Sequence, residues 1–321
     1  MKYIKFINPL FFAILVLAML SCDRDEIFDR EQYKNVVALL SDDGFNIFME
    51  ELPFSEDGVD AYIAANCGGS LATTEPIEMK IIEDPSLLNN FNLSSYDTDV
   101  QKYANYLAAD RYSINNSTIT IPAGERSGRM KIEIRTAGLS PDSLYFIPFR
   151  VSSFSNYEVN PNKGTVMLQL FLKNYYATTK TTSPGKLGYT TYSHRGVKGS
   201  TNTMISKSVF PIGANEVRIY AGIKTYQTTD SEKTIRQWSL KLVVGEDNKV
   251  TILPWDSSQN GVKVTPVDGD PDYPNIFKIE DTGFKTYKTF LIRYDYVDPD
   301  DGNTYAMKEE LRLEFDENDE E

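Results

Sequence analysis

The sequence is poor in the residues that most enzymes use for catalysis. Its 321 residues include one histidine, His194, and two cysteines, Cys22 and Cys67. A cysteine nucleophile needs a histidine close by, and a zinc site needs several His and Cys ligands at short spacing. The sequence also lacks a glycine-rich phosphate loop and the nucleophile elbow of serine hydrolases. We therefore predict no enzymatic activity and no cofactor, and we interpret Cys67 as a small buried residue.

The sequence also has too few positive charges to favour a nucleic-acid partner. It carries 33 Lys and Arg residues against 46 Asp and Glu residues, which gives a formal net charge of -13 at pH 7. A surface that binds phosphates needs clustered Lys and Arg, and an acidic chain repels the nucleic-acid backbone. Long apolar runs are equally scarce, because no segment after residue 20 is apolar enough to span a membrane.

The one long apolar run lies at the N-terminus. Lysines precede an apolar stretch over residues 6–20, and Ser21 and Cys22 follow it. This order is typical of a bacterial export signal. The four residues that end in Cys22 resemble a lipobox, with Met19 at the position where Leu is usual. The resemblance implies that residues 1–21 are a signal peptide and that Cys22 carries the lipid anchor. An ordinary secretory signal with a chance cysteine nearby is the alternative.

An acidic segment follows the cysteine. Residues 22–32 are predicted to form a tether, and Asp23-Arg24-Asp25-Glu26 resembles the export tag of Bacteroidetes lipoproteins. That resemblance implies a lipid-anchored protein of the outer membrane that faces the cell exterior. In the enterobacterial sorting scheme Asp23 would instead favour the inner membrane, and a plain acidic linker is the remaining alternative. With Cys22 lipidated, Cys67 is the only thiol left, and no internal disulfide can form.

Residues 33–172 have the pattern of a β-sandwich. Tyr, Thr, Ser and Asn are abundant, and several segments alternate apolar and polar residues, which favours strands. Seven or more short strands separated by turns are typical of two packed sheets. The exception is residues 86–108, where apolar residues three or four apart predict one or two short helices. The predicted strands cover residues 35–40, 46–52, 59–66, 77–83, 118–121, 129–136, 145–152 and 164–172.

A polar, Thr-rich segment at residues 173–185 predicts a domain linker. The domain that follows, residues 186–315, has the pattern of strands with no helices between them. Its last two strands flank a polar turn and form a hairpin. About eight such strands predict an antiparallel β-barrel similar to a lipocalin, or a second sandwich. Residues 316–321 form an acidic tail. The predicted strands cover residues 187–193, 203–209, 216–223, 235–244, 249–253, 261–264, 276–280, 287–297 and 304–315.

Three segments of the first domain connect it with a known family. They are residues 112–114 (Tyr-Ser-Ile), residues 118–128 (Thr-Ile-Thr-Ile-Pro-Ala-Gly-Glu-Arg-Ser-Gly) and residues 139–149 (Leu-Ser-Pro-Asp-Ser-Leu-Tyr-Phe-Ile-Pro-Phe). These segments resemble the immunoglobulin-like N-terminal domain of Bacteroidetes surface lipoproteins from glycan-utilisation loci. The same domain precedes the catalytic module of some family 18 endoglycosidases. The resemblance covers residues 33–172, and the closing hairpin resembles that of the C-terminal domains in this family.

This resemblance implies a surface lipoprotein that binds glycan for an uptake system and has no catalytic role. The expected partners are a glycan ligand and the outer-membrane importer complex of the same locus. A structural or adhesive surface protein without glycan specificity is the alternative, and an enzyme is a third hypothesis. The family 18 catalytic motif is missing, because the nearest segment, residues 268–272, lacks its glutamate.

Two loops of the second domain are candidate glycan sites. Proteins bind the apolar faces of sugars with aromatic rings and bind the hydroxyls with polar side chains. Trp255 is followed by Asp256, and Tyr273 is preceded by Asp272, in loops rich in such partners. Loop aromatics folded onto the end of the barrel are the alternative. We interpret the other tryptophan, Trp238, as a core residue.

Two acidic turns have the composition of calcium loops, because hard cations prefer several oxygen ligands from a compact segment. The same residues are common in turns that bind nothing, and we interpret both as structural. The two turns contain Asp268, Asp270 and Asp272 in one case and Asp298, Asp300, Asp301 and Asn303 in the other.

The single histidine, His194, is interpreted as an exposed loop residue.

Overall fold

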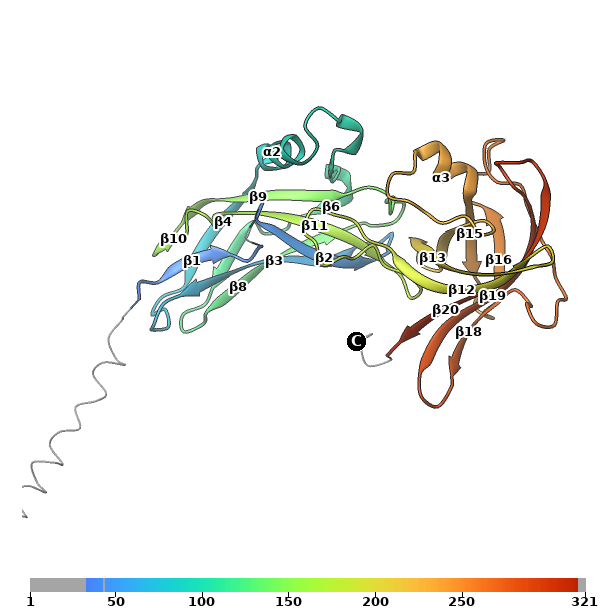
Figure 1. Cartoon of the computed structure of the whole chain (residues 1–321). Helices are drawn as coiled ribbons and strands as arrows, with labels where there is room; N and C mark the ends of the chain where they lie inside the picture. Colours follow the sequence, from blue (N-terminus) through green and yellow to red (C-terminus); the bar gives the residue numbers. More distant parts are fainter. Residues whose placement is uncertain (1–32, 43, 317–321) are drawn as a thin grey trace, which may run out of the picture.

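The computed structural model describes residues 33–42 and 44–316, which form two β-rich domains side by side (Figure 1). The predicted signal peptide, Cys22 and the acidic tether lie outside the described residues, as do residues 317–321 of the tail. In the described part of the chain, no helix has both the length and the apolar character needed to cross a membrane. The prediction of an all-β chain with two domains is confirmed.

The N-terminal domain is a sandwich of two sheets. The first sheet contains β1 (Val36–Leu39), β3 (Val59–Gly68), β6 (Tyr112–Ser113), β8 (Ser127–Ile134) and β10 (Glu158–Val159). The second contains β2 (Ile47–Pro53), β4 (Ile77–Glu83), β5 (Asn105–Tyr106), β7 (Thr118–Ile121), β9 (Tyr145–Phe154) and β11 (Thr165–Lys173). Their orders are β10-β1-β3-β8-β6 and β2-β11-β9-β4-β7, with β5 beside β9. β11 lies inside its sheet, parallel to β2 and antiparallel to β9.

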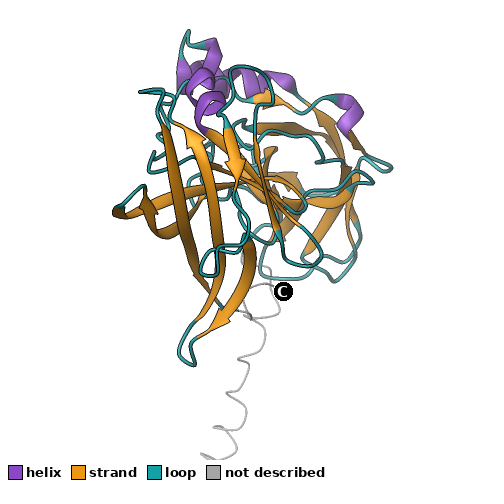
Figure 2. Cartoon of the chain, turned by 90° about the vertical axis from the view of Figure 1, so that its right-hand side faces the viewer, coloured by secondary structure: helices purple, strands orange, loops and turns teal. Residues whose placement is uncertain are grey.

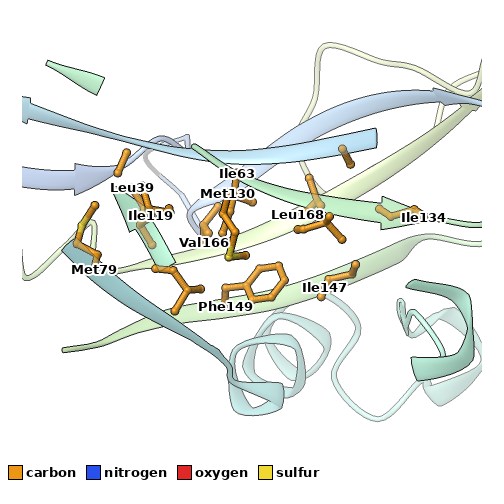
Figure 3. Packing of buried hydrophobic residues seen from close by; sticks show 14 of the residues in the cluster. Leu39, Ile63, Met79, Ile119, Met130, Ile134, Ile147, Phe149, Val166 and Leu168 are labelled. Atoms are coloured by element: carbon orange, nitrogen blue, oxygen red, sulfur yellow. The ribbon is translucent and has the colours of Figure 1, made fainter. Parts of the chain in front are cut away.

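Alternation along the strands builds the sandwich core. In β3 every second residue from Ala61 to Cys67 is buried, and in β8 the buried residues again alternate with exposed ones. Figure 3 shows Ile63 and Met130 from the first sheet directed towards Phe149 and Leu168 from the second. Each buried aliphatic or aromatic side chain of this kind contributes about 1.5–3 kcal/mol to stability. Cys67 is 4% exposed, which confirms the interpretation of this residue as buried.

One helix, α2 (Pro85–Tyr96), packs on the outer face of the second sheet (Figure 1). Its N-cap is Asp84, whose carboxylate accepts a hydrogen bond from the N–H of Ser86 at 3.2 Å. The ring of Phe91 lies 5.2 Å from the ring of Phe146 in β9. A helix is thus present where the apolar spacing predicts one. Two short 3₁₀ turns follow it, at Val100–Lys102 and Ala109–Arg111.

The C-terminal domain is one strongly curled sheet (Figure 2). Its strands are β12 (Thr190–Lys198), β13 (Thr201–Gly213), β14 (Glu216–Tyr220), β15 (Ser239–Val244), β16 (Val250–Pro254), β17 (Val264–Pro266), β18 (Ile276–Asp281), β19 (Thr286–Val297) and β20 (Thr304–Phe315). They run in the order β16-β15-β14-β13-β12-β20-β19-β17, and β18 also pairs with β19. The predicted hairpin is confirmed as β19 and β20.

The two edges of this sheet meet. An isolated bridge joins Lys249, just before β16, to Ile276 of β18. Beside it, the N–H of Val250 donates to the carbonyl of Asn275 at 2.8 Å. The sheet is therefore a nearly closed barrel, and of the two predicted forms the barrel holds and the second sandwich does not.

One predicted strand is partly a helix. Of residues 235–244 only β15 is extended, and α3 (Glu232–Trp238) precedes it, so the prediction of a second domain without helices is wrong. Ser231 caps α3, because its hydroxyl accepts a hydrogen bond from the N–H of Thr234 at 3.2 Å. Ile235 and Trp238, three residues apart, both face the barrel core. Trp238 is 4% exposed, as expected of a core residue.

Charged residues fill part of the barrel interior. Lys207 of β13 and Glu309 of β20 are buried, and the ammonium of Lys207 lies 2.7 Å from both carboxylate oxygens. The hydroxyl of Tyr294 in β19 donates to the same carboxylate. Burial raises the pKa of Glu309 and lowers the pKa of Lys207, and the two opposite charges counteract both shifts. Each of the two buried charges is therefore stabilised by the other as its counter-charge.

The chain's single histidine also faces this interior. His194 is fully buried in β12, with Nε2 3.8 Å from a carboxylate oxygen of Glu309, so the prediction of an exposed loop residue is wrong. Every second residue of β12 from Tyr192 to Gly196 is buried, which places His194 on the inner face. Burial, aided by the positive charge of Lys207, lowers the pKa of His194 to about 3. The imidazole is therefore neutral at physiological pH.

The segment between β11 and β12 packs against the sandwich. The side chain of Gln169 in β11 accepts from the N–H of Gly185 and donates to the carbonyl of Lys186, both at 2.8 Å. Leu187 packs against the apolar cluster beneath α2. Buried contacts thus fix the end of the connecting segment to the sandwich domain.

Candidate functional site

A cleft opens at the junction of the two domains, where β11 leads into the connecting segment. Its volume is about 560 Å³, within the range typical of small-molecule sites, which often lie between domains. The walls come from the end of β2, from the segment after β11 and from one end of the barrel. They are lined by Glu51, Pro53, Phe54, Lys173, Asn174, Tyr175, Tyr176, Ala177, Thr178, Thr190, Ala214, Lys288 and Leu313.

Asn174 fixes the backbone that forms the floor of the cleft. Its side-chain oxygen accepts hydrogen bonds from the N–H groups of Tyr176 and Ala177, at 3.0 and 2.9 Å. Its side-chain nitrogen donates to the carbonyls of Gly213 and Glu216, both at 2.8 Å. The first pair forms a local turn of the kind that Asn favours, and the second pair attaches this turn to the β13–β14 hairpin. These hydrogen bonds fix the backbone on both sides of Tyr175 and thereby orient its side chain.

The side chain of Tyr175 is 45% exposed. The ring of Tyr176 meets it edge to face at a centroid distance of 5.4 Å. The ammonium of Lys288 lies 3.9 Å from its ring centroid, and Lys288 is itself only 5% exposed. A cation over an aromatic face is an attractive contact, so the ring is held in place while half of it remains accessible.

The opposite wall is polar. Glu51 of β2 accepts a hydrogen bond from the hydroxyl of Thr178 at 2.7 Å and lies 3.3 Å from the ammonium of Lys173. Glu51 is the single carboxylate among the lining residues, whereas most glycosidases use a pair of carboxylates. The cleft therefore offers an aromatic ring, hydroxyls and charged groups suited to binding a polar ligand, and its lining lacks a pair of carboxylates for hydrolysis.

The loop that carries Trp255 and Asp256 does not line this cleft. Trp255 is partly buried against the barrel core, and the guanidinium of Arg218 lies 4.8 Å from its ring centroid. A hydrogen bond from the N–H of Ser258, with help from Arg236, lowers the pKa of Asp256. The packing of Trp255 favours the alternative of a loop aromatic folded onto the barrel.

The second predicted pair lies elsewhere. Tyr273 is two residues from Asn275, which bonds to the first residue of β16, whereas Trp255 follows the last residue of that strand. Lys308, beside the ring of Tyr273, lies level with Asn202 of β13, whereas Arg218, beside the ring of Trp255, lies level with Phe210 of the same strand. Eight strand residues span about 26 Å, so the structure does not bring the two aromatics together. The ammonium of Lys308 lies 5.5 Å from the ring centroid of Tyr273, and Asp272 is exposed.

The two acidic turns pair with lysines. Asp270 lies 2.6 Å from the ammonium of Lys308, and Asp298 lies 2.9 Å from that of Lys198. Within residues 33–42 and 44–316, no group of three or more His, Cys, Asp or Glu side chains is arranged to hold a metal ion.

Sequence reasoning missed Tyr175 and Lys288. Tyr175 lies in the segment predicted to be a linker, and its one signal was an aromatic pair, Tyr175-Tyr176, in an otherwise polar stretch. Lys288 lies in a strand whose inner face is otherwise aromatic and aliphatic, and no local motif marks it. Both become site residues only because two distant segments meet at the domain junction.

The comparisons with known proteins agree with this architecture. A family model of an N-terminal domain matches residues 33–158, and a model of a C-terminal domain matches residues 164–312. Together they cover most of the chain. A search of curated proteins by sequence finds no match.

Three solved structures share the fold over nearly their full length. A Bacteroides ovatus protein of unknown function has a TM-score of 0.60 at 14% identity, covering 87% of this chain and 94% of its own. A multidomain protein including DUF1735, from the same species, has a TM-score of 0.59 at 13% identity, covering 88% and 95%. An auxiliary nutrient binding protein from Bacteroides thetaiotaomicron has a TM-score of 0.50 at 15% identity, covering 85% and 92%. The chain therefore contains the N-terminal and the C-terminal domain that the two family models describe, joined in that order, and it shares the fold of these Bacteroides structures.

Proposed function

We propose that the protein binds glycan in the cleft between its domains and does not hydrolyse it. The observation that carries this proposal is Tyr175, an aromatic ring held in place at the cleft by Lys288 and Tyr176 and still 45% exposed. An oriented, half-exposed ring is what the apolar face of a sugar requires. The nutrient-binding protein from Bacteroides thetaiotaomicron with the same fold supports a binding role in nutrient uptake.

The polar groups around the ring suit the edge of a sugar. Glu51 presents carboxylate oxygens that accept hydrogen bonds from hydroxyls. Thr178, whose hydroxyl already donates to Glu51, and Thr190, whose hydroxyl bonds to the backbone of Thr178, line the same cleft. A few polar groups around an apolar surface fix the orientation of a ligand and provide specificity. A ligand in this cleft would contact both domains and the segment between them.

Replacement of Tyr175 tests the proposal. Loss of one stacking ring costs about 1.4 kcal/mol, so Tyr175→Ala should weaken glycan binding roughly tenfold, while Tyr175→Phe should keep most of it. Phe284→Ala is the matched control, because Phe284 is 97% exposed and does not line the cleft. Binding would be measured by a glycan array followed by calorimetric titration. Normal binding by Tyr175→Ala would contradict the proposal, and weakening by Trp255→Ala instead would favour the loop predicted from the sequence.

We further propose that Cys22 anchors the protein by lipid to the outer membrane, facing the cell exterior, beside the importer complex of its locus. The support is the lipobox-like end of the apolar run and the acidic residues behind it. Cys22→Ala should abolish incorporation of labelled palmitate and release the protein into the soluble fraction. Tight membrane association of that variant would show that another feature anchors the chain.

A further inference from the structure

An arginine of the barrel is neutralised by the other domain. Arg218 of β14 is fully buried, and its two terminal nitrogens donate to the two carboxylate oxygens of Asp142 at 2.5 and 2.6 Å. Asp142 belongs to the turn between β8 and β9 of the sandwich. This bidentate geometry is the strongest form of carboxylate recognition by arginine.

Aromatic rings enclose the guanidinium on the barrel side. Its carbon lies 4.5 Å from the ring centroid of Phe210 and 4.8 Å from that of Trp255. Tyr226 packs against Phe210 at a centroid distance of 4.8 Å, and Tyr189 packs against Tyr226 at 5.5 Å. A central charged anchor surrounded by rings that exclude water is the usual form of a dominant contact in a protein interface.

The free-energy cost of burying the charge of Arg218 links this ion pair to the contact between the domains. A buried guanidinium without a counter-charge is strongly unfavourable, and here the counter-charge comes from the sandwich. Separation of the domains would leave Arg218 between its two rings without Asp142. Docking without the carboxylate of Asp142 would bury the guanidinium uncompensated, so the docked arrangement depends on this ion pair.

The same hairpin that carries Arg218 reaches the cleft. β13 and β14 pair from Phe210 opposite Arg218 to Gly213 opposite Glu216. The carbonyls of Gly213 and Glu216 accept the two hydrogen bonds from Asn174 that fix the cleft floor. A continuous path of backbone pairing and side-chain hydrogen bonds thus runs from the ion pair through the hairpin to Asn174, the residue beside Tyr175.

We infer that Arg218 and Asp142 are positioning residues that hold the two domains at one angle and keep the cleft preformed. Neither side chain lines the cleft. The effect on ligand binding rests on the proposed function, whereas the fixed angle does not depend on it.

The test compares Asp142→Asn with Asp60→Asn in the mature chain carrying Cys22→Ser. Asp60 lies 2.7 Å from Lys131 in a solvent-exposed pair, so Asp60→Asn controls for loss of one surface carboxylate. Spin labels at Glu125 in the sandwich and Glu246 in the barrel, both exposed, report the distance between domains. The parent and Asp60→Asn should give one narrow distribution, and Asp142→Asn should give one at least about twofold broader, because a lone buried charge disfavours docking.

A second variant separates positioning from misfolding. Replacing both partners by apolar residues, Asp142→Leu with Arg218→Met, removes the uncompensated charge and should restore a narrow distribution. Circular dichroism should show native β structure in every variant. A narrow, unshifted distribution for Asp142→Asn would overturn the inference, as would a broad one for Asp60→Asn.

Glycan titration forms the last arm. Asp142→Asn should weaken binding of the glycan identified on the array roughly fivefold or more, because only part of the population then has a formed cleft. Unchanged affinity in a chain with a broadened distribution would overturn the link to the cleft. Absence of glycan binding by the parent would refute the proposed function and leave the distance measurement as the test of the fixed angle.

Discussion

At the scale of single residues, the barrel interior shows how charge is kept away from water. The ammonium of Lys207 contacts the carboxylate of Glu309 and donates to the carbonyl of Tyr220 at 2.7 Å. The hydroxyl of Tyr294, which donates to Glu309, accepts from the N–H of Gly222 at 2.8 Å. Strands β13, β14, β19 and β20 meet in this one network. This network occupies the barrel interior, which is the space that an apolar ligand would need if the barrel bound one as a lipocalin does.

Breaking this pair should cost more than removing it. Glu309→Gln leaves the ammonium of Lys207 buried without a counter-charge and should lower the free energy of unfolding by about 3–5 kcal/mol. Lys207→Met combined with Glu309→Leu should recover most of that loss, because neither charge is then buried. Urea unfolding of both variants checks this. Equal stability of the single and double variants would show that the pair is not coupled.

The buried histidine predicts an acid sensitivity. The folded state lowers the pKa of His194 to about 3, so below the ordinary value of 6.5 the unfolded chain binds the extra proton. This contribution to stability is complete above pH 6.5 and is lost as the pH falls towards 3. At pH 5 the loss is about 2 kcal/mol.

His194→Gln isolates the effect, because Lys207 and Glu309, which face the ring from β13 and β20, stay in place. The raised pKa of Glu309 acts in the opposite sense in both proteins and therefore cancels from the comparison. Stability would be measured by urea unfolding at pH 7.5 and pH 5. The same decrease in parent and variant would exclude His194 as its source.

At the scale of elements, two glycines with nearly the same φ differ in what surrounds them. Gly222 after β14 has φ +60° and Gly199 between β12 and β13 has φ +61°, but only at Gly222 would a Cβ atom lie 2.0 Å from the hydroxyl of Tyr296. Gly222→Ala should therefore cost about 3 kcal/mol or more, and Gly199→Ala about 1 kcal/mol. Thermal melts of both variants check this, and equal losses would mean that backbone conformation alone matters.

Most strands could be predicted because alternation is a local signal. The strands at 77–83 and 118–121 match β4 and β7 residue for residue. α3 was missed because its two turns run directly into β15, so apolar residues at helical and at strand spacing formed one continuous segment. Its cap, Ser231, was the local signal that a helix begins there.

His194 illustrates the opposite error. The alternation of Tyr192, His194 and Gly196 was visible in the sequence, but a polar residue beside Arg195 suggested a loop. Its burial depends on Lys207 and Glu309, which lie far away in the sequence and compensate each other's charge. Partners of this kind leave no local pattern, so such a site cannot be predicted from its own segment.

At the scale of the whole molecule, the position of the domain boundary affects stability. A sandwich fragment that ends at Gly188 keeps Leu187 and the Gly185–Lys186 backbone that bonds to the buried side chain of Gln169. A fragment that ends at Lys173 exposes that side chain and part of the cluster beneath α2. The longer fragment should be more stable by about 2–4 kcal/mol. Chemical denaturation of both fragments checks this, and equal midpoints would show that the segment contributes little.

The candidate site was the part least open to prediction from the sequence. Tyr175, Glu51 and Lys288 come from three separate elements and meet only when the domains dock. Trp255, by contrast, was conspicuous in the sequence because tryptophan is rare and its loop is polar. In the structure its ring packs on Arg218. An aromatic side chain in a polar loop could contact either a glycan or the barrel itself, and only the tertiary structure could distinguish these two alternatives.

The position of β11 has a consequence for how such proteins evolve. The C-terminal family model begins at residue 164, yet β11 lies between β2 and β9 in the sandwich, and Val166–Leu172 are all buried there. The family model counts this strand with the second domain, whereas in the fold it belongs to the first. Recombination at the boundary of the models would remove an inner strand from the sandwich. A gene fusion that joins this sandwich to a different module should therefore succeed only when the incoming segment opens with an apolar strand of similar length.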